Sequence, residues 1–145
     1  MANVDSPMGF RPRRHVSPAG SMGQNAYPLA SAYGSNIFTG DAVVLTSGKL
    51  AVATASSASL LGVFAGCRYR NASGETIFAP YWPASTATLN SEDAVGFVWD
   101  DPGIIYEAQT ETGVAFVLAT HHLTLADLIA THAGRTFTWQ SGMEL

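Results

Sequence analysis

The order of apolar and polar residues predicts short strands separated by turns from about Tyr27 onward. The clearest alternation places Val95, Phe97 and Trp99 on one face of a strand and the residues between them on the other. Short apolar runs bounded by Gly, Asn, Asp and Ser are typical of an all-β domain. The predicted strands are residues 42–46, 49–54, 60–70, 76–82, 94–99, 104–109, 114–120 and 135–140.

Turn residues indicate how some of these strands are joined. Ser47-Gly48 is a two-residue hairpin signal between the first two strands. Gly62 and Gly66 within the third strand indicate a bulge or a close approach of another backbone. The sequence DDPG at 100–103 is a turn, because Asp side chains bond to the local backbone. We expect its two flanking strands and the next strand along the chain to form an antiparallel meander.

One helix and one arm complete the predicted layout. The helix lies between Thr124, which can cap it, and Gly134, which stops it. Prolines and glycines interrupt residues 1–25, where neither a helical nor an alternating period is present. The sequence therefore predicts a mainly β fold: a single antiparallel β-barrel or sandwich domain over residues 26–145, with one short helix and an extended N-terminal arm over 1–25.

Composition and charge suggest that part of the surface is covered by a partner. The chain has 145 residues, enough for one domain, and only 12% are charged, whereas about 25% is typical. The net charge is −4, but Arg11, Arg13 and Arg14 hold three of the seven basic residues. Because only Asp5 opposes them, the first fifteen residues carry a net charge of +2 and the remainder −6. A basic arm on an acidic body suggests a segment that seeks an acidic surface.

Candidate nucleophiles and metal ligands form no convincing site. Cys67 could pair with a histidine, but its strand pattern favours a buried, inert thiol. As the single cysteine it forms no internal disulfide, which fits a reducing compartment. His121 and His122 would point to opposite faces of a strand, which disfavours chelation of one ion. We therefore expect no catalytic residue, no metal site and no cofactor.

Two acidic pairs are candidates for a calcium site or for the carboxylates of a glycoside hydrolase. Glu92-Asp93 and Asp100-Asp101 supply four carboxylates, but no loop of regularly spaced oxygen ligands surrounds them. The second pair belongs to the DDPG turn, which has its own physical explanation. Phosphate-binding glycine loops and the nucleophile elbow of hydrolases are also absent from the sequence. The sequence thus favours a binding or structural protein over an enzyme.

The opening MANVDSPMGFRP resembles the N-terminus of small head proteins of tailed bacteriophages, known as decoration or cement proteins. The resemblance continues through residues 32–50, 60–75 and 94–109. It implies a structural virion protein, made in the host bacterial cytoplasm, that binds the capsid exterior and stabilises contacts between major capsid proteins. Copies commonly form homotrimers or homodimers. Related chains run further past the segment at 141–145, which implies an incomplete C-terminus.

The arm is the predicted contact with the major capsid protein. Its expected contact residues are two apolar anchors and three arginines: Met8, Phe10, Arg11, Arg13 and Arg14. The planar fork of arginine pairs bidentately with carboxylates. We expect removal of residues 1–14 to abolish capsid binding and to leave the β body folded. Three arginines are too few to indicate nucleic acid, and no apolar run reaches the ~18 residues of a membrane span.

Two other interpretations remain open from the sequence. The first is another virion or tail-associated binding module that recognises a host glycan or protein through an exposed Trp82 or Tyr81. The second is a small hydrolase that uses Cys67 or the acidic pairs.

Overall fold

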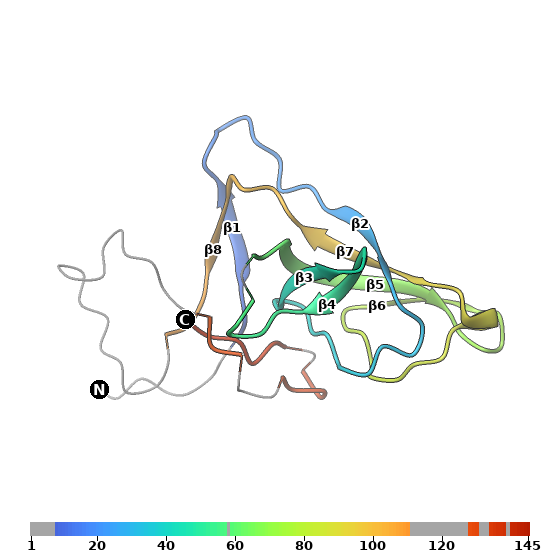
Figure 1. The fold of residues 1–145 in the computed structure, drawn as a ribbon. Helices are drawn as coiled ribbons and strands as arrows, with labels where there is room; N and C mark the ends of the chain where they lie inside the picture. The colour runs from blue at the N-terminus through green and yellow to red at the C-terminus, as the bar shows by residue number, and fades with distance from the viewer. Residues whose placement is uncertain (1–7, 58, 111–127, 131–133, 139) are drawn as a thin grey trace.

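The computed structural model describes residues 8–57, 59–110, 128–130, 134–138 and 140–145, and these form an antiparallel β fold (Figure 1). The mainly β fold class is confirmed. The elements in this part of the chain are β1 (Arg11–His15), β2 (Asn25–Leu29), β3 (Ala42–Thr46), β4 (Lys49–Val52), β5 (Gly62–Arg70), β6 (Thr76–Ala79), the 3-10 turn η1 (Leu89–Ser91), β7 (Ala94–Trp99) and β8 (Ile104–Glu107).

The strands form a larger and a smaller sheet. The larger sheet has the order β2-β7-β5-β3-β4, and β6 pairs with the C-terminal half of β5. Its end strands β2 and β4 come close to each other, but they are not paired within the described residues. The sheet therefore curls without closing into a barrel, and a sandwich-like layout fits better. The smaller sheet is a two-stranded ribbon of β1 and β8, which stands beside the larger one (Figure 1).

The hairpin and the bulge predicted from the sequence are both confirmed. Ser47 and Gly48 have φ angles of 51° and 78° between β3 and β4, as a two-residue turn with the strand twist requires. In β5 the pairing with β7 skips one residue between Phe64 and Gly66. Gly66 has a φ of 151°, and a Cβ there would lie 3.0 Å from the Ala79 carbonyl oxygen. The glycine thus allows both the bulge and the close approach of β6.

The core lies against β5 and β7. Along β7 the residues Ala94, Gly96 and Val98 are buried, whereas the alternate residues with larger side chains are half-buried, which confirms the predicted alternation. The small residues face inward because Leu50 of β4 packs there. A Cβ at Gly96 would lie only 2.4 Å from the Leu50 Cδ1. Trp82 belongs to the same core cluster and is completely buried.

The predicted meander is wrong. The turn at 100–103 exists, since the Ile104 N–H donates to the Asp101 carbonyl at 3.1 Å. However, β7 pairs with β2 and β5, whereas β8 pairs with β1, so the turn is a corner between the two sheets. The third strand of the expected meander, 114–120, lies outside the described residues.

The predictions for the C-terminal third are not upheld where the structure describes it. The helix expected between Thr124 and Gly134 falls mostly outside the described residues, but residues 128–130 are not helical. The Ile129 N–H donates to the Glu144 carbonyl at 2.9 Å as part of an antiparallel bridge. In the segment predicted as a strand, 135–140, the described residues 135–138 form a turn, and a bridge between Arg135 and Gln140 closes it. Within the described residues, the short helical element is η1.

Candidate interaction surface

The N-terminal segment, predicted as an irregular arm, is threaded into the body of its own chain. Gly9 is buried with a φ of 67°, and a Cβ there would lie 2.3 Å from Ser141 Cβ. The next residue, Phe10, donates its N–H to the Gly40 carbonyl at 2.9 Å. Its ring packs against the small buried cluster that contains Met143. The chain itself therefore orders residues 8–10.

Residues 11–15, also predicted as part of an irregular arm, form strand β1. They pair antiparallel with β8, and the Val16 N–H extends the ribbon by donating to the Gly103 carbonyl at 2.8 Å. Sequence reasoning missed this strand because Pro12 and the arginines around it interrupt any apolar alternation. Pro12 is compatible with a strand in a two-stranded sheet, where the missing N–H can face outward. The arm prediction is thus corrected: β1 gains its order from β8.

All three arginines of β1 are exposed on this ribbon. The pairing of β1 with β8 skips Arg13, between Pro12 and Arg14. Regular alternation would turn either Arg13 or Arg14 inward, but the skipped residue leaves both exposed. Arg13 pairs with the Glu107 carboxylate of β8. Among the described residues, Arg11 and Arg14 form no ion pair.

The predicted capsid contacts therefore separate into two groups. Met8 and Phe10 are half-buried against their own chain, so the structure does not present them as exposed anchors. The three arginines are exposed to solvent on a paired strand. The five residues thus lie along one segment, but the two apolar side chains are half-buried whereas the three arginines are exposed.

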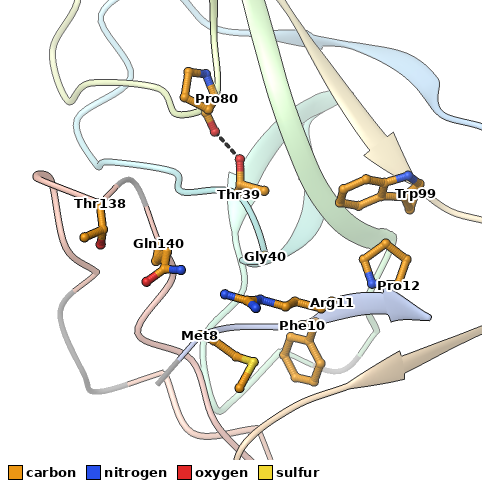
Figure 2. A pocket seen from close by; sticks show the side chains of 10 residues that line it. All are labelled: Met8, Phe10, Arg11, Pro12, Thr39, Gly40, Pro80, Trp99, Thr138 and Gln140. Atoms are coloured by element: carbon orange, nitrogen blue, oxygen red, sulfur yellow. Dashed lines mark hydrogen bonds between the residues drawn. The ribbon is translucent and has the colours of Figure 1, made fainter. Parts of the chain in front are cut away.

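A pocket of about 300 Å³ lies where this segment meets the C-terminal residues (Figure 2). Its walls come from the start of β1, the loop before β3, the end of β6, β7, and the two C-terminal residues Thr138 and Gln140. Arg11 is the one ionisable side chain among the described residues that line it. Thr39 donates its hydroxyl to the Pro80 carbonyl across the rim (Figure 2). A lone guanidinium with neutral neighbours suits a polar contact and supplies no acid–base pair.

A second hollow, here called the corner groove, lies between the ribbon and the adjoining ends of β5 and β7. It has a volume of about 470 Å³ and a mainly apolar lining that includes Leu60, Leu61 and Trp99. Asp100 and Asp101 of the corner turn contribute carboxylates to it. No signal in the local sequence predicts this groove, because it forms only when β8 leaves the larger sheet.

Neutral groups and one histidine surround the two corner carboxylates. Asp100 accepts hydrogen bonds from Asn25 Nδ2, at 2.9 Å and 3.0 Å to its two oxygens, and from the Tyr27 hydroxyl. Burial opposes ionisation of Asp100, but these bonds outweigh it and lower its pKa. The pKa of Asp101 is lowered by the Gly103 N–H at 2.7 Å and also by His15, whose Nε2 lies 3.3 Å away. Both carboxylates therefore carry charge at neutral pH.

Of the candidate residues for enzyme chemistry, Cys67 occupies a structural position. Cys67 is buried in β5, as predicted, and burial raises the pKa of its thiol to about 12. Within the described part of the chain, no group of three or more His, Cys, Asp or Glu side chains could hold a metal ion. His121 and His122 lie outside that part. Among the described residues, the hydrogen-bond partner of the Cys67 thiol is the Tyr81 carbonyl oxygen, which accepts at 3.4 Å and is not a base for catalysis.

The aromatic groove expected of a glycan-binding module is not formed by its predicted residues. Trp82 is completely buried and packs edge-on against Tyr69, with 5.3 Å between the ring centroids. Tyr81 stacks on Phe38 with 5.7 Å between the ring centroids. Trp82 therefore belongs to the core, and the glycan-binding interpretation cannot use it as an exposed ring.

Comparisons with known proteins leave the chain without an assigned family. Searches against protein-family models, curated proteins and solved structures give no match. The described part of the chain contains no helix that is both long and apolar enough to cross a membrane.

Proposed function

We propose that this chain is a structural virion protein that binds the outer surface of a phage capsid and stabilises contacts between major capsid proteins. The observation that carries the proposal is the β1–β8 ribbon, which displays three exposed arginines on a paired strand. The resemblance of the N-terminal sequence to decoration proteins supports the same conclusion. Under this proposal the site of action is the virion exterior, and the partner is the major capsid protein.

The ribbon suits this role because it is ordered before binding. A free arm would lose conformational entropy on docking, whereas a strand fixed by β8 has lost most of it already. Guanidinium groups form charge-assisted hydrogen bonds with carboxylates on a partner surface. Arg11 and Arg14, which form no ion pair among the described residues, can make such bonds without breaking an internal one.

Stabilisation of the shell follows from linkage. A protein that binds the assembled shell and not the separated subunits shifts the equilibrium toward the shell by mass action. Each interface can be modest, since many copies bind one particle and oligomers add avidity.

The decisive experiment is binding of purified protein to purified empty shells by co-sedimentation. We expect the double variant Arg11→Glu, Arg14→Glu to lose binding and to keep the circular dichroism spectrum of the parent. The matched control is the double variant Arg68→Glu, Arg70→Glu, which reverses the same number of charges at two exposed positions of β5. Equal shell occupancy of the double variant and the control would refute the proposal, as would localisation of the protein on tails instead of heads.

Charge reversal is a sharper test than removal of residues 1–14. The structure gives a reason to expect that the deletion also damages the body. It removes Gly9 from a buried position and Phe10 from a half-buried one, and it takes away most of the strand that pairs with β8. Loss of binding after the deletion would therefore have two explanations, whereas the double variant leaves the backbone pairing intact.

A further inference from the structure

The turn at residues 135–138 presents a phenylalanine to solvent. Phe137 is 93% exposed, the largest exposed fraction among the large hydrophobic residues that the structure describes. The bond from the Arg135 N–H to the Gln140 carbonyl, 2.9 Å long, closes the turn and fixes its base. Single exposed apolar residues are common and alone indicate nothing. This one is informative because a charged residue accompanies it and a matching hollow exists on the same molecule.

The matching hollow is the corner groove. Its volume of about 470 Å³ lies in the range of sites that enclose small ligands, so it has room for an aromatic ring. Leu60, at its mouth, is 53% exposed, which shows that apolar surface there remains uncovered by the chain itself. The lining includes no lysine or arginine among the described residues.

The negative charges at the corner groove indicate what kind of segment can bind there. Asp100 and Asp101 place two negative charges beside apolar surface, and their described partners are neutral donors and His15. A suitable partner therefore combines a large apolar side chain with a nearby cation. Arg135 is exposed, lies two residues before Phe137 and forms no ion pair within the described residues.

We propose that the 135–138 turn of one copy of this chain docks in the corner groove of a second copy, with Phe137 in the hollow and Arg135 facing Asp100 and Asp101. One copy cannot make this contact with itself. No residue of the turn lines the groove. The turn lies at the bottom of the view, well below the 100–103 corner that joins β7 to β8 (Figure 1). The contact is head-to-tail, so repeated copies close into a ring if the rotation allows it.

This contact deepens the proposed function by naming the surfaces that join copies, but it does not depend on capsid binding. It predicts that the purified protein associates with itself in the absence of shells. A monomer that still binds shells would overturn the head-to-tail contact and leave the proposed function standing. A protein that associates with itself but does not bind shells would overturn the proposed function and leave the head-to-tail contact standing.

The first test is sedimentation velocity over a range of concentrations. We expect the parent chain to associate, and Phe137→Ser to associate roughly thirtyfold more weakly, as for loss of a central interface residue. The matched control is Phe78→Ser, because Phe78 is also large, apolar and 71% exposed but lies on β6. A monomeric parent chain, or equal weakening by both substitutions, would overturn the proposal.

The second test distinguishes a head-to-tail contact from a symmetric one. Leu60→Lys places a cation in the groove and leaves the turn intact, whereas Phe137→Ser leaves the groove intact. At a concentration at which the parent chain associates, each variant alone should be largely monomeric. A mixture of the two variants should form one-to-one dimers through the single pair of intact surfaces. If the mixture stays monomeric, or if Leu60→Lys alone still associates like the parent, the groove is not the docking site for the turn.

Discussion

Substitution of Gly9 tests whether the N-terminal segment is part of the folded body. Gly9 combines a φ of 67° with a position where a Cβ would lie 2.3 Å from Ser141 Cβ and 2.7 Å from the Gly40 carbonyl oxygen. An alanine costs about 1–2 kcal/mol for the left-handed backbone alone. The overlap with backbone then forces residues 8–10 outward. This breaks the bond from the Phe10 N–H to Gly40, worth about 1 kcal/mol, and exposes part of the Phe10 ring.

We therefore expect Gly9→Ala to lower the free energy of unfolding by roughly 3–4 kcal/mol in a urea titration, a large share of a typical total. Hydrogen exchange should show loss of protection at the Phe10 amide. The control is Gly34→Ala, since a Cβ at Gly34 has no atom within 4 Å and its φ is not positive. It should change stability by less than about 1 kcal/mol. If the two variants are equally stable and the Phe10 amide stays protected, the segment is not docked as described.

Three further substitutions or treatments test the core, the ribbon and the thiol. Trp82→Ala empties a completely buried site and should cost about 3–5 kcal/mol in the same titration. Arg13→Ala removes an exposed ion pair with Glu107 and should change stability by less than about 1 kcal/mol; a larger loss would contradict the surface character of the pair. Because burial raises the pKa of Cys67 to about 12, iodoacetamide should label the thiol only after unfolding. The pKa of Cys67 is 9.0 in the unfolded chain and about 12 in the folded chain, so between these pH values the thiol loses its proton more readily when the chain is unfolded. Cys67 should therefore lower the free energy of unfolding by about 1.4 kcal/mol for each unit by which the pH rises in this range.

Local features of the fold were predictable from the sequence because local backbone chemistry determines them. Ser47-Gly48 forms the expected hairpin since both residues take positive φ. The glycine-marked bulge at Gly66 and the alternation along β7 follow from the same kind of reasoning. Each of these could be predicted from a few neighbouring residues without knowing the order of the strands in the sheet.

Pairing partners were not predictable from the same patterns. The DDPG turn at 100–103 is compatible with both a hairpin and a corner, because a turn sequence fixes the local chain direction and not the sheet that the next strand joins. Strand β8 pairs with β1, about ninety residues earlier in the chain. Ile129 shows the same limit: its apolar spacing fits a helix, but it pairs with Glu144 in the C-terminal segment. The corner groove could therefore not be predicted from the sequence, since it depends on the nonlocal pairing of β8 with β1.

The N-terminal segment shows why an irregular sequence does not identify a free arm. Its glycine and proline suggest a chain without its own structure, but each fits one position in the folded body. Gly9 is the residue that can pass between Gly40 and Ser141, and Pro12 fits a strand of a two-stranded ribbon. Composition indicates that such a segment needs a partner surface; it does not say whether that surface belongs to another protein or to the same chain. Here the same chain supplies that surface. As a consequence, the strand that carries the three arginines loses its conformational entropy on folding, and that loss would not have to be met again when a partner binds.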